Sequence, residues 1–316
     1  MDHREIEISI VVPVFNESQT LPKLVEGIEK SLDRYRVEII FIDDGSTDDS
    51  PNVLEHLQNN STIKIDVITF RKNFGKSMAL SAGLKEVEGK IVITMDADLQ
   101  NDPKDLPAFI QEIHDGADLV TGWRANRDDP FEKRIPSKFY NWVTSKISGL
   151  PIHDFNCGLK AYRKEMLEEL YLYGEMHRFI PVLVHKKGFT VKEISVLHHP
   201  REHGVSKYGF ERYLRGALDL ITVMFLTTYF VRPMHLFGGI GLSTIMTGIL
   251  IFIYLFFGRW LQGISIGSSP LFTISFFAMG IGAQIVIFGF LAEMIVYWQQ
   301  SLQVQTTVKK KSNSIP

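Results

Sequence analysis

Cysteine and net charge are the two things this sequence has little of. A single cysteine, Cys157, occurs among 316 residues, so the chain cannot form an internal disulfide, and we interpret its thiol as a small core side chain. Lys and Arg number 34 against 36 Asp and Glu, and a chain so nearly neutral lacks the basic surplus of many nucleic-acid-binding proteins. We therefore expect no nucleic-acid partner. Residues 1–7 are charged and precede a strand pattern, which argues against a signal peptide.

Two long stretches near the carboxyl terminus contain no Asp, Glu, Lys or Arg at all. They cover residues 233–258 and 260–292, and each supplies the roughly 20 apolar residues that cross a bilayer. A buried helix pair of a soluble protein is the alternative, which uncharged runs of this length disfavour. We expect transmembrane helices over 235–257 and 271–298. Basic residues flank the pair, including 309–311, and predict a cell (inner) membrane protein whose two termini and N-terminal domain are cytoplasmic.

The segment before the first uncharged stretch has the pattern of an amphipathic helix. Its apolar residues recur at intervals of three and four, as at Tyr213, Ala217 and Ile221, with charged residues between them. This predicts a helix that lies in the membrane interface, and burial in a helical bundle is the alternative. The expected domains are a soluble domain at 1–207, interfacial amphipathic helices at 208–232, a two-helix transmembrane domain at 233–300 and a basic cytoplasmic tail at 301–316.

Strand patterns alternate with helix patterns through the first 122 residues. β-rich runs predict strands at 8–14, 37–42, 65–70, 91–95 and 118–122, and apolar residues at helical spacing predict helices at 21–32, 53–57, 75–87 and 106–114. This alternation predicts an α/β domain with a mostly parallel, Rossmann-like sheet flanked by helices. In such sheets, ligands bind beyond the carboxyl ends of the strands.

Polar residues follow several of those strands, whereas two common phosphate-binding motifs are missing. Neither G-x-G-x-x-G nor G-x-x-x-x-G-K-S/T follows the first strand, which disfavours dinucleotide oxidoreductases and P-loop enzymes. Asp96 and Asp98 follow the fourth strand, one residue apart. Two carboxylates this close are costly unless a cation lies between them, so we predict a hard divalent ion whose remaining ligands come from a diphosphate. A surface turn is the alternative, because Asp is common in turns.

Three ordered motifs carry a resemblance to a known family. They are Val-Val-Pro-Val-Phe-Asn-Glu at 11–17, Asp-Asp-Gly-Ser-Thr-Asp at 43–48 and Asp-Ala-Asp-Leu-Gln at 96–100. In order and spacing they resemble the family 2 glycosyltransferases, which have the GT-A fold. Later segments are similar to the polyprenyl-phosphate glycosyltransferases of that family: Gly122-Trp123-Arg124, Arg134-x-x-Ser137, Asp154 to Lys160 and Arg201 to Tyr208. The two predicted spans resemble the bacterial undecaprenyl-phosphate glucosyltransferase type of this subgroup, which also includes dolichyl-phosphate mannose synthase.

The resemblance implies that the first two motifs bind the nucleotide of a sugar donor. Pro13, Phe15 and Glu17 would lie against its base and ribose. Asp44, or less favourably Asp43, would accept a hydrogen bond from the base. Core packing is an equally good interpretation of Phe15.

The resemblance also implies that the Asp-Ala-Asp motif meets the donor diphosphate. Asp96 and Asp98 would hold Mg²⁺ or Mn²⁺, with Ala97 between them and Gln100 orienting one of them. Such an ion stabilises the charge that builds on the leaving nucleoside diphosphate. Two cations of the later segment are expected to contact the diphosphate directly: Arg201 and Lys207.

The acceptor that the resemblance implies is a lipid phosphate. A phosphate is already an oxyanion near neutral pH, with a second pKa of about 6, so it needs a general base less than a sugar hydroxyl does. Asp154 occupies the family's proposed base position and is counted, with Asp98, as catalytic; a structural carboxylate is the alternative. Four residues are expected to hold the acceptor phosphate: Arg124, Arg127, Arg134 and Ser137. Segment 124–137 is charged and aperiodic, which predicts a loop beside the site.

The resemblance implies an inverting transferase that moves one sugar from a nucleotide sugar to a polyprenyl phosphate, with UDP-glucose and undecaprenyl phosphate favoured. GDP-mannose with dolichyl phosphate is the near alternative. A membrane polysaccharide synthase is a second alternative, although the Gln-x-x-Arg-Trp motif of those enzymes is missing. A catalytically inactive membrane scaffold is a third alternative, and the presence of Asp96, Asp98 and Asp154 argues against it. We further expect a homo-oligomer, and a separate flippase that receives the product.

Overall fold

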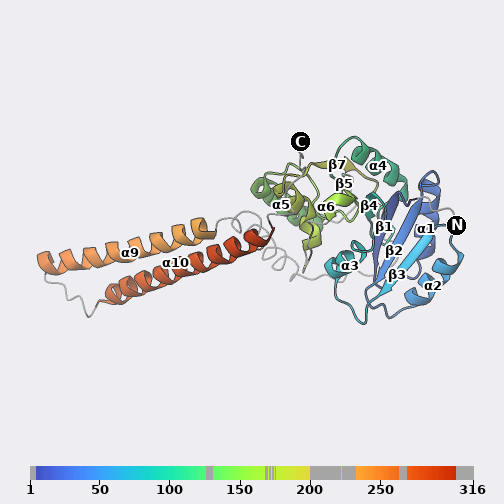
Figure 1. Cartoon of the computed structure of the whole chain (residues 1–316). Coiled ribbons are helices and arrows are strands. Elements are labelled where there is room, and N and C mark those ends of the chain that lie inside the picture. Colours follow the sequence, from blue (N-terminus) through green and yellow to red (C-terminus); the bar gives the residue numbers. More distant parts are fainter. Residues whose placement is uncertain are drawn as a thin grey trace, which may run out of the picture. The chain divides into compact units, whose positions relative to one another are not determined.

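The computed structural model of the chain describes residues 5–125, 131–167, 170, 172, 174, 176–199, 222, 233–262 and 269–303. The chain divides into two compact units, residues 1–223 and 224–316. Figure 1 shows a sheet flanked by helices in the first unit and a pair of long helices in the second.

A seven-stranded sheet forms the centre of the first unit. Its strands are β1 (Ile8–Val14), β2 (Val37–Asp43), β3 (Lys64–Thr69), β4 (Ile91–Thr94), β5 (Leu119–Trp123), β6 (Lys160–Arg163) and β7 (Val191–Ser195). They lie in the order β3-β2-β1-β4-β6-β5-β7. Every neighbouring pair is parallel except the two that involve β6. The predicted α/β domain with a mostly parallel sheet is thereby confirmed.

Helices cover both faces of this sheet (Figure 1). They are α1 (Leu21–Ser31), α2 (Ser50–Asn60), α3 (Lys76–Gly83), η1 (Pro103–Asp105), α4 (Leu106–His114), α5 (Phe131–Ser148), α6 (Lys164–Leu167), η2 (Met176–Phe179) and α7 (Ile180–Lys186). Helices α1, α2 and α4 enclose the main core on one face. Helix α3 packs on the other face of β1 and β2, and η2 and α7 continue that layer toward β5 and β7.

The central strands are apolar throughout because both of their faces are buried. All seven residues of β2 are buried, and so are six of the seven in β1, which is the pattern of a strand inside a covered parallel sheet. Helix α1 buries one stripe at helical spacing, including Leu24 and Ile28. Pro22 falls in the first turn of that helix, where a missing backbone N–H costs nothing.

The sequence predicts five strands in this unit, and the structure adds β6 and β7. Strand β6 has four residues and begins with Lys160, so it shows no apolar run, and β7 is an edge strand whose residues are half-buried or exposed. Because β6 runs antiparallel between β4 and β5, its amino end lies where those two strands end. The segment from Asp154 to Leu159 is thereby brought to the rim where ligands of such sheets bind.

The prediction of a loop over 124–137 is wrong for its second half, because α5 begins at Phe131. Charged residues fill the first turn of this helix and Pro136 follows, which hides the helical period. The period emerges only further along, where Thr144 and Ser148 are buried four residues apart. Residues 126–130 lie outside the described residues.

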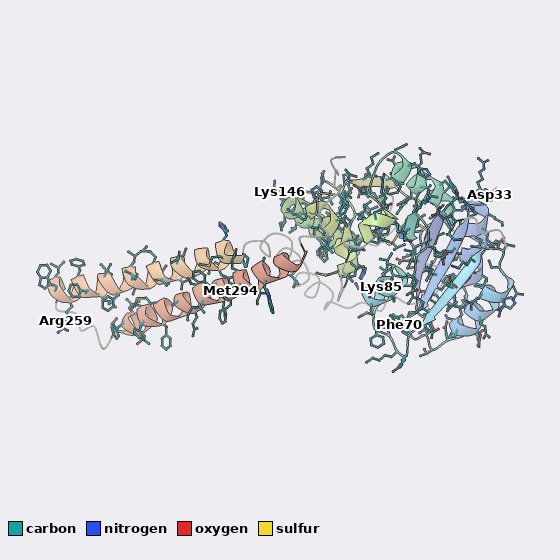
Figure 2. The ribbon with its side chains drawn as sticks, in the orientation of Figure 1. Asp33, Phe70, Lys85, Lys146, Arg259 and Met294 are labelled. Atoms are coloured by element: carbon teal, nitrogen blue, oxygen red, sulfur yellow. The ribbon has the colours of Figure 1, made fainter. Side chains whose placement is uncertain are left out.

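The second unit contains α9 (Pro233–Gln262) and α10 (Pro270–Gln303), which lie side by side (Figure 1). Both are long and apolar enough to cross a membrane. A Cβ atom on Gly241 would lie 2.7 Å from the carbonyl oxygen of Gly282, and one on Gly248 would lie 2.7 Å from that of Ser275. The two backbones thus approach closely at small residues, as in packed membrane helices. Figure 2 shows mostly hydrocarbon side chains on both helices.

A buried polar cluster lies near the amino ends of β1 and β2, away from the rim. The Glu38 carboxylate accepts hydrogen bonds from the Ser9 hydroxyl at 2.5 Å, the Glu88 amide at 2.7 Å and the Lys64 ammonium at 2.9 Å. Burial by itself raises the pKa of Glu38, but these bonds outweigh it and hold the pKa below 4.5. Glu38 therefore stabilises the folded chain above pH 4.5, and this contribution is lost as the pH falls.

We expect Glu38→Ala to lower the free energy of unfolding by about 2 kcal/mol, because it leaves the Ser9 hydroxyl and the Glu88 amide without their acceptor. The measurement is the thermal unfolding midpoint of the full chain in detergent at pH 7. The matched control is Glu5→Ala, which removes an exposed partner of Lys90 and should leave the unfolding midpoint unchanged. Equal unfolding midpoints for Glu38→Ala and Glu5→Ala would contradict this assignment. A difference between the midpoints of the wild type and Glu38→Ala that grows below pH 4.5 would contradict it as well.

Candidate active site

The carboxyl ends of β1, β2 and β4 meet at one rim of the sheet, as the sequence predicts. The Asp44 amide donates to the Val14 carbonyl at 2.8 Å, and the Met95 amide donates to the Val11 carbonyl at 3.2 Å. These bonds continue the ladder past the strand ends. The polar residues that follow each strand are therefore neighbours across the sheet.

The Asp96-Ala97-Asp98 turn is the most constrained part of this rim. Leu99 has a φ of 57°, a left-handed conformation that costs a residue with a Cβ about 1–2 kcal/mol. The Asp98 side chain is buried and accepts from the Gln100 amide at 3.2 Å. Such strain persists only where the surroundings hold it, and it is concentrated at functional sites. The Gln100 backbone amide thus orients one aspartate, and the predicted role of Gln100 at the donor stays a prediction.

Contacts from a distant segment hold this turn in place. The His199 amide donates to the Gln100 carbonyl at 2.9 Å, and His198 forms a β-bridge with Asn101. The chain that leads toward residue 201 therefore starts beside the Asp-Ala-Asp turn. Arg201 and Lys207 themselves lie outside the described residues, as does most of segment 208–232, so their predicted roles stay predictions.

Asp96 is surrounded by cations. Its Oδ1 forms an ion pair with the Lys76 ammonium, and its Oδ2 faces Gly158, where an added Cβ would lie only 2.3 Å away. Burial by itself raises the pKa of Asp96, but Lys76, Lys160 and Arg124 outweigh it and lower the pKa. The carboxylate is therefore held ionised, and Oδ1 is the oxygen that Lys76 contacts.

Asp43 and Asp44, predicted to meet the nucleotide base, both bind backbone amides in this structure. The Asp44 carboxylate accepts from Phe74 at 2.7 Å and from Gly75 at 2.9 Å, and Asp43 accepts from Ser46 at 2.9 Å. Asp44 thus fixes the loop that leads into α3. Three other predicted nucleotide-binding residues line the same rim, half-buried: Pro13, Phe15 and Glu17.

Arg124 and Asp154 form a bidentate ion pair beneath the rim. The Arg124 Nε donates to Asp154 Oδ2 at 2.7 Å and its Nη2 donates to Oδ1 at 3.1 Å. Burial by itself lowers the pKa of Arg124, but Asp154 reverses that effect and raises it. The two residues predicted to act separately, as phosphate ligand and as base, therefore act on each other.

Glu193 of strand β7 positions Asp154. Its carboxylate accepts from the Asp154 amide at 2.9 Å and from the His153 amide at 2.8 Å. The His153 ring stacks on Trp123 with ring centroids 4.3 Å apart. Sequence reasoning misses Glu193 because β7 carries no clear strand pattern.

Two more titratable residues lie at the rim, and the sequence analysis assigns a role to neither of them. Lys160 is buried and donates to the Cys157 carbonyl, and burial lowers its pKa to about 8. The His177 Nδ1 lies 2.9 Å from the Ser77 hydroxyl, and burial lowers the pKa of His177 well below its ordinary value. Lys160 belongs to a segment that carries the family resemblance, whereas His177 has no motif around it. Cys157 is fully buried, as its interpretation as a core residue predicts.

The predicted acceptor-phosphate residues are only partly described. Ser137 lies half-buried on α5, and Arg134 lies on the same helix one turn earlier. Arg127 lies outside the described residues. Arg124 is the one whose side-chain contacts the structure gives, and they are with Asp154.

The residues at the turn fit a divalent ion that arrives with a diphosphate. Among the described residues, no group of three or more His, Cys, Asp or Glu side chains could hold a metal ion. Asp96 and Asp98 supply hard carboxylate oxygens from one short turn, and Mg²⁺ is commonly bound by one or two carboxylates together with substrate phosphates. The predicted choice of Mg²⁺ or Mn²⁺ is compatible with this donor set.

Comparison with known proteins identifies close relatives of the chain. Residues 9–171 match the family described as Glycosyl transferase family 2. A dodecaprenyl-phosphate galacturonate synthase of Rhizobium johnstonii is 40% identical over 298 residues, which cover 92% of this chain and 88% of that protein. An undecaprenyl-phosphate 4-deoxy-4-formamido-L-arabinose transferase of Proteus mirabilis is 35% identical over 292 residues, with 92% and 88% covered.

Solved structures share the fold of the first unit. Glucosyl-3-phosphoglycerate synthase of Mycobacterium tuberculosis, in complex with Mn²⁺, UDP and glucosyl-3-phosphoglycerate, superposes with a TM-score of 0.54. The match covers 70% of this chain and 80% of that one, at 19% identity. At this identity the likeness establishes the GT-A fold alone.

We expect the Arg124–Asp154 pair to be strongly coupled in a double-mutant cycle of unfolding free energy. Arg124→Met and Asp154→Leu should each cost about 3 kcal/mol, because each leaves a buried charge without its partner. The double variant should cost at least about 1 kcal/mol less than the two single losses combined.

The matched control is the exposed pair of Glu26 and Lys30, four residues apart on α1. Glu26→Leu with Lys30→Met should show no measurable coupling, because solvent screens an exposed ion pair. Additive losses at Arg124 and Asp154 would show that the two residues do not act as a pair.

Proposed function

Because the chain belongs to glycosyl transferase family 2, we propose that it moves one sugar from a nucleotide sugar to a polyprenyl phosphate. An oxygen of the acceptor phosphate attacks the anomeric carbon, the bond from that carbon to the diphosphate breaks, and a nucleoside diphosphate leaves with the bonding electrons. The observation that carries the proposal is the Asp96-Ala97-Asp98 turn at the sheet rim, where Asp96 packs against Gly158 of the segment that contains Asp154.

The donor side of the site is built from the turn and the loop before α3. Asp96 and Asp98 would hold Mg²⁺ or Mn²⁺, which as a Lewis acid stabilises the charge on the leaving diphosphate. The half-buried Phe15 and Glu17 would contact the nucleoside. Asp44 fixes the conformation of the loop before α3 by accepting hydrogen bonds from two of its backbone amides. Arg201 and Lys207 would add positive charge to the diphosphate from the segment after β7.

The acceptor side is built around the Arg124–Asp154 pair. A guanidinium has five N–H donors, and Asp154 accepts from two of its nitrogens in a fixed geometry. The remaining donors of Arg124 would bind an oxygen of the acceptor phosphate. Asp154 then serves as the residue that orients Arg124, since an ionised acceptor phosphate supplies its own nucleophilic oxygen.

Arg134 and Ser137, one turn apart on α5, would hold the same phosphate, together with Arg127. Residues spaced by three lie on one face of a helix, so a single group could meet both. The inverting outcome requires one displacement and no covalent intermediate, so no enzyme nucleophile enters this scheme.

The names of the relatives change which donor sugar we propose to test first. The resemblance in the sequence favours UDP-glucose, whereas the two relatives described above are named for galacturonate and for formamido-arabinose. UDP-galacturonate is therefore the first donor to test, and UDP-glucose and GDP-mannose are the next. Undecaprenyl phosphate remains the favoured acceptor, with dolichyl phosphate as its alternative.

The membrane assignment supports a lipid acceptor. The chain has two candidate spans, Pro233–Leu261 and Pro270–Val296, and nucleotide sugars are cytoplasmic. The catalytic domain and both termini are therefore proposed to face the cytoplasm at the inner membrane. We further propose that the chain forms a homo-oligomer and that a separate flippase receives the product.

The test is sugar transfer by the detergent-solubilised full chain, from radiolabelled UDP-galacturonate, UDP-glucose and GDP-mannose to a short polyprenyl phosphate with Mn²⁺. We expect a lipid-linked product with one donor. Asp98→Ala should lower the turnover about 100-fold or more, because it removes a group that holds the metal on the leaving diphosphate.

Asp115→Ala is the matched control, since it removes an equivalent charge at the end of α4, outside the proposed site, and should keep the full rate. Absence of lipid-linked product with every donor would refute the proposed function. Full turnover of Asp98→Ala, or of the wild type without divalent metal, would refute the metal site.

A second variant separates the acceptor side from the donor side. Arg134→Ala should raise the KM for polyprenyl phosphate about tenfold, because it removes a charge-assisted bond to phosphate, and should leave the KM for the nucleotide sugar within about twofold. Lys146→Ala, exposed near the end of the same helix, is the control and should change neither constant. A larger change in the KM for the nucleotide sugar would contradict this division of the cations.

A further inference from the structure

Asp96, a proposed metal ligand, already has a cation on one of its oxygens. Lys76 is the first residue of α3, and its ammonium contacts Oδ1 of Asp96. The two side chains are 30% and 31% exposed, so the ion pair lies at the surface of the site. Oδ2 is the oxygen that packs closer to Gly158, where an added Cβ would lie 2.3 Å from Oδ2 and 2.8 Å from Oδ1. A metal ion that binds Asp96 through Oδ1 therefore meets Lys76 there.

Lys76 is also the cation that is able to move. Lys160, the other lysine near Asp96, is buried in β6 between two strands and donates to the Cys157 carbonyl. Lys76 has a flexible stem of four carbons that carries a compact charge. Its backbone is fixed, because Asp44 binds the amides of Phe74 and Gly75 just before it. The ammonium can swing while the loop stays in place.

The charges of the described residues closest to the turn balance before any ligand arrives. Among these residues, Asp96 and Asp98 carry two negative charges, and Lys76 and Lys160 carry two positive ones. A free divalent ion would add two positive charges to a partly buried cluster that is already neutral, which is costly at low dielectric. The diphosphate of a nucleotide sugar carries about two negative charges at neutral pH, so the ion and the diphosphate together enter without that cost.

We infer that the Lys76 ammonium and the divalent metal compete for Oδ1 of Asp96, and that the donor diphosphate resolves this competition by accepting the displaced ammonium. This inference rests on the metal–diphosphate site of the proposed function and adds a regulation of that site. The site then has a low affinity for the metal alone and a higher affinity for the metal when the nucleotide is bound. Lys76 couples the binding of the metal to the binding of the nucleotide. Lys76 is thus a positioning residue that delivers the metal to the turn with the donor.

The experiment measures Mn²⁺ binding, by the electron paramagnetic resonance signal of free Mn²⁺, to the full chain in detergent with and without UDP and without a lipid acceptor. In the wild type, UDP should tighten Mn²⁺ binding. Lys76→Met should bind Mn²⁺ alone about tenfold more tightly than the wild type does, and the effect of UDP on Mn²⁺ affinity should shrink by a similar factor.

Two further variants separate this competition from a general effect of charge. Lys72→Met removes the same charge from the same loop, and its ammonium lies over the Phe74 ring at 5.2 Å; this variant should keep the wild-type Mn²⁺ affinity within about twofold. Lys76→Arg retains a cation and should keep most of the coupling between Mn²⁺ and UDP.

A Lys76→Met variant that binds Mn²⁺ alone no better than the wild type would overturn the inference, as would a Lys72→Met variant that matches it. Failure of the proposed function has a different signature, which is the absence of lipid-linked sugar while Mn²⁺ and UDP still bind together. A wild-type chain that binds no Mn²⁺ even with UDP would overturn both the inference and the metal site.

Discussion

The neutralisation of Asp96 is the interaction on which the rest of the site depends. A carboxylate at the end of β4 is partly buried, and three cations, Lys76, Lys160 and Arg124, lower its pKa against the effect of burial. Each cation has a different place in the fold: Lys76 starts α3, Lys160 lies in β6, and Arg124 directly follows β5. The rim therefore assembles its charges only when all three elements are in place, which ties the chemistry of the site to the folding of the sheet.

Strand β6 is the structural means of that assembly. A purely parallel sheet would bring only carboxyl ends of strands to the rim, but the antiparallel β6 brings its amino end there as well. Lys160, Gly158 and Asp154 come from that end, and they respectively neutralise Asp96, make room for it and orient Arg124. One reversed strand thus joins the proposed donor half of the site to the proposed acceptor half.

The sequence predicts the parallel core and the rim because those features are local. Strands β1, β2 and β3 are runs of six or seven residues rich in β-branched side chains. Their ends agree with the predicted ones to within one residue. The unpredicted features are those that tertiary pairing creates. Strand β6 is too short to show a period, and α5 hides its period behind Pro136. No local pattern joins Lys76 to Asp96 or Arg124 to Asp154, since each pair spans 20 or 30 residues and forms only in the folded sheet.

The pairing of Arg124 with Asp154 bears on how two anions are brought together. A diphosphate and a lipid phosphate repel each other, and a general base would add a third negative charge beside them. The buried pair avoids this, because the carboxylate is already neutralised by the guanidinium that would meet the acceptor. A phosphate acceptor needs orientation more than deprotonation, so a positioning carboxylate suits it better than a free base does. The same arrangement would serve a sugar hydroxyl poorly, which favours a lipid phosphate over a growing polysaccharide as the acceptor.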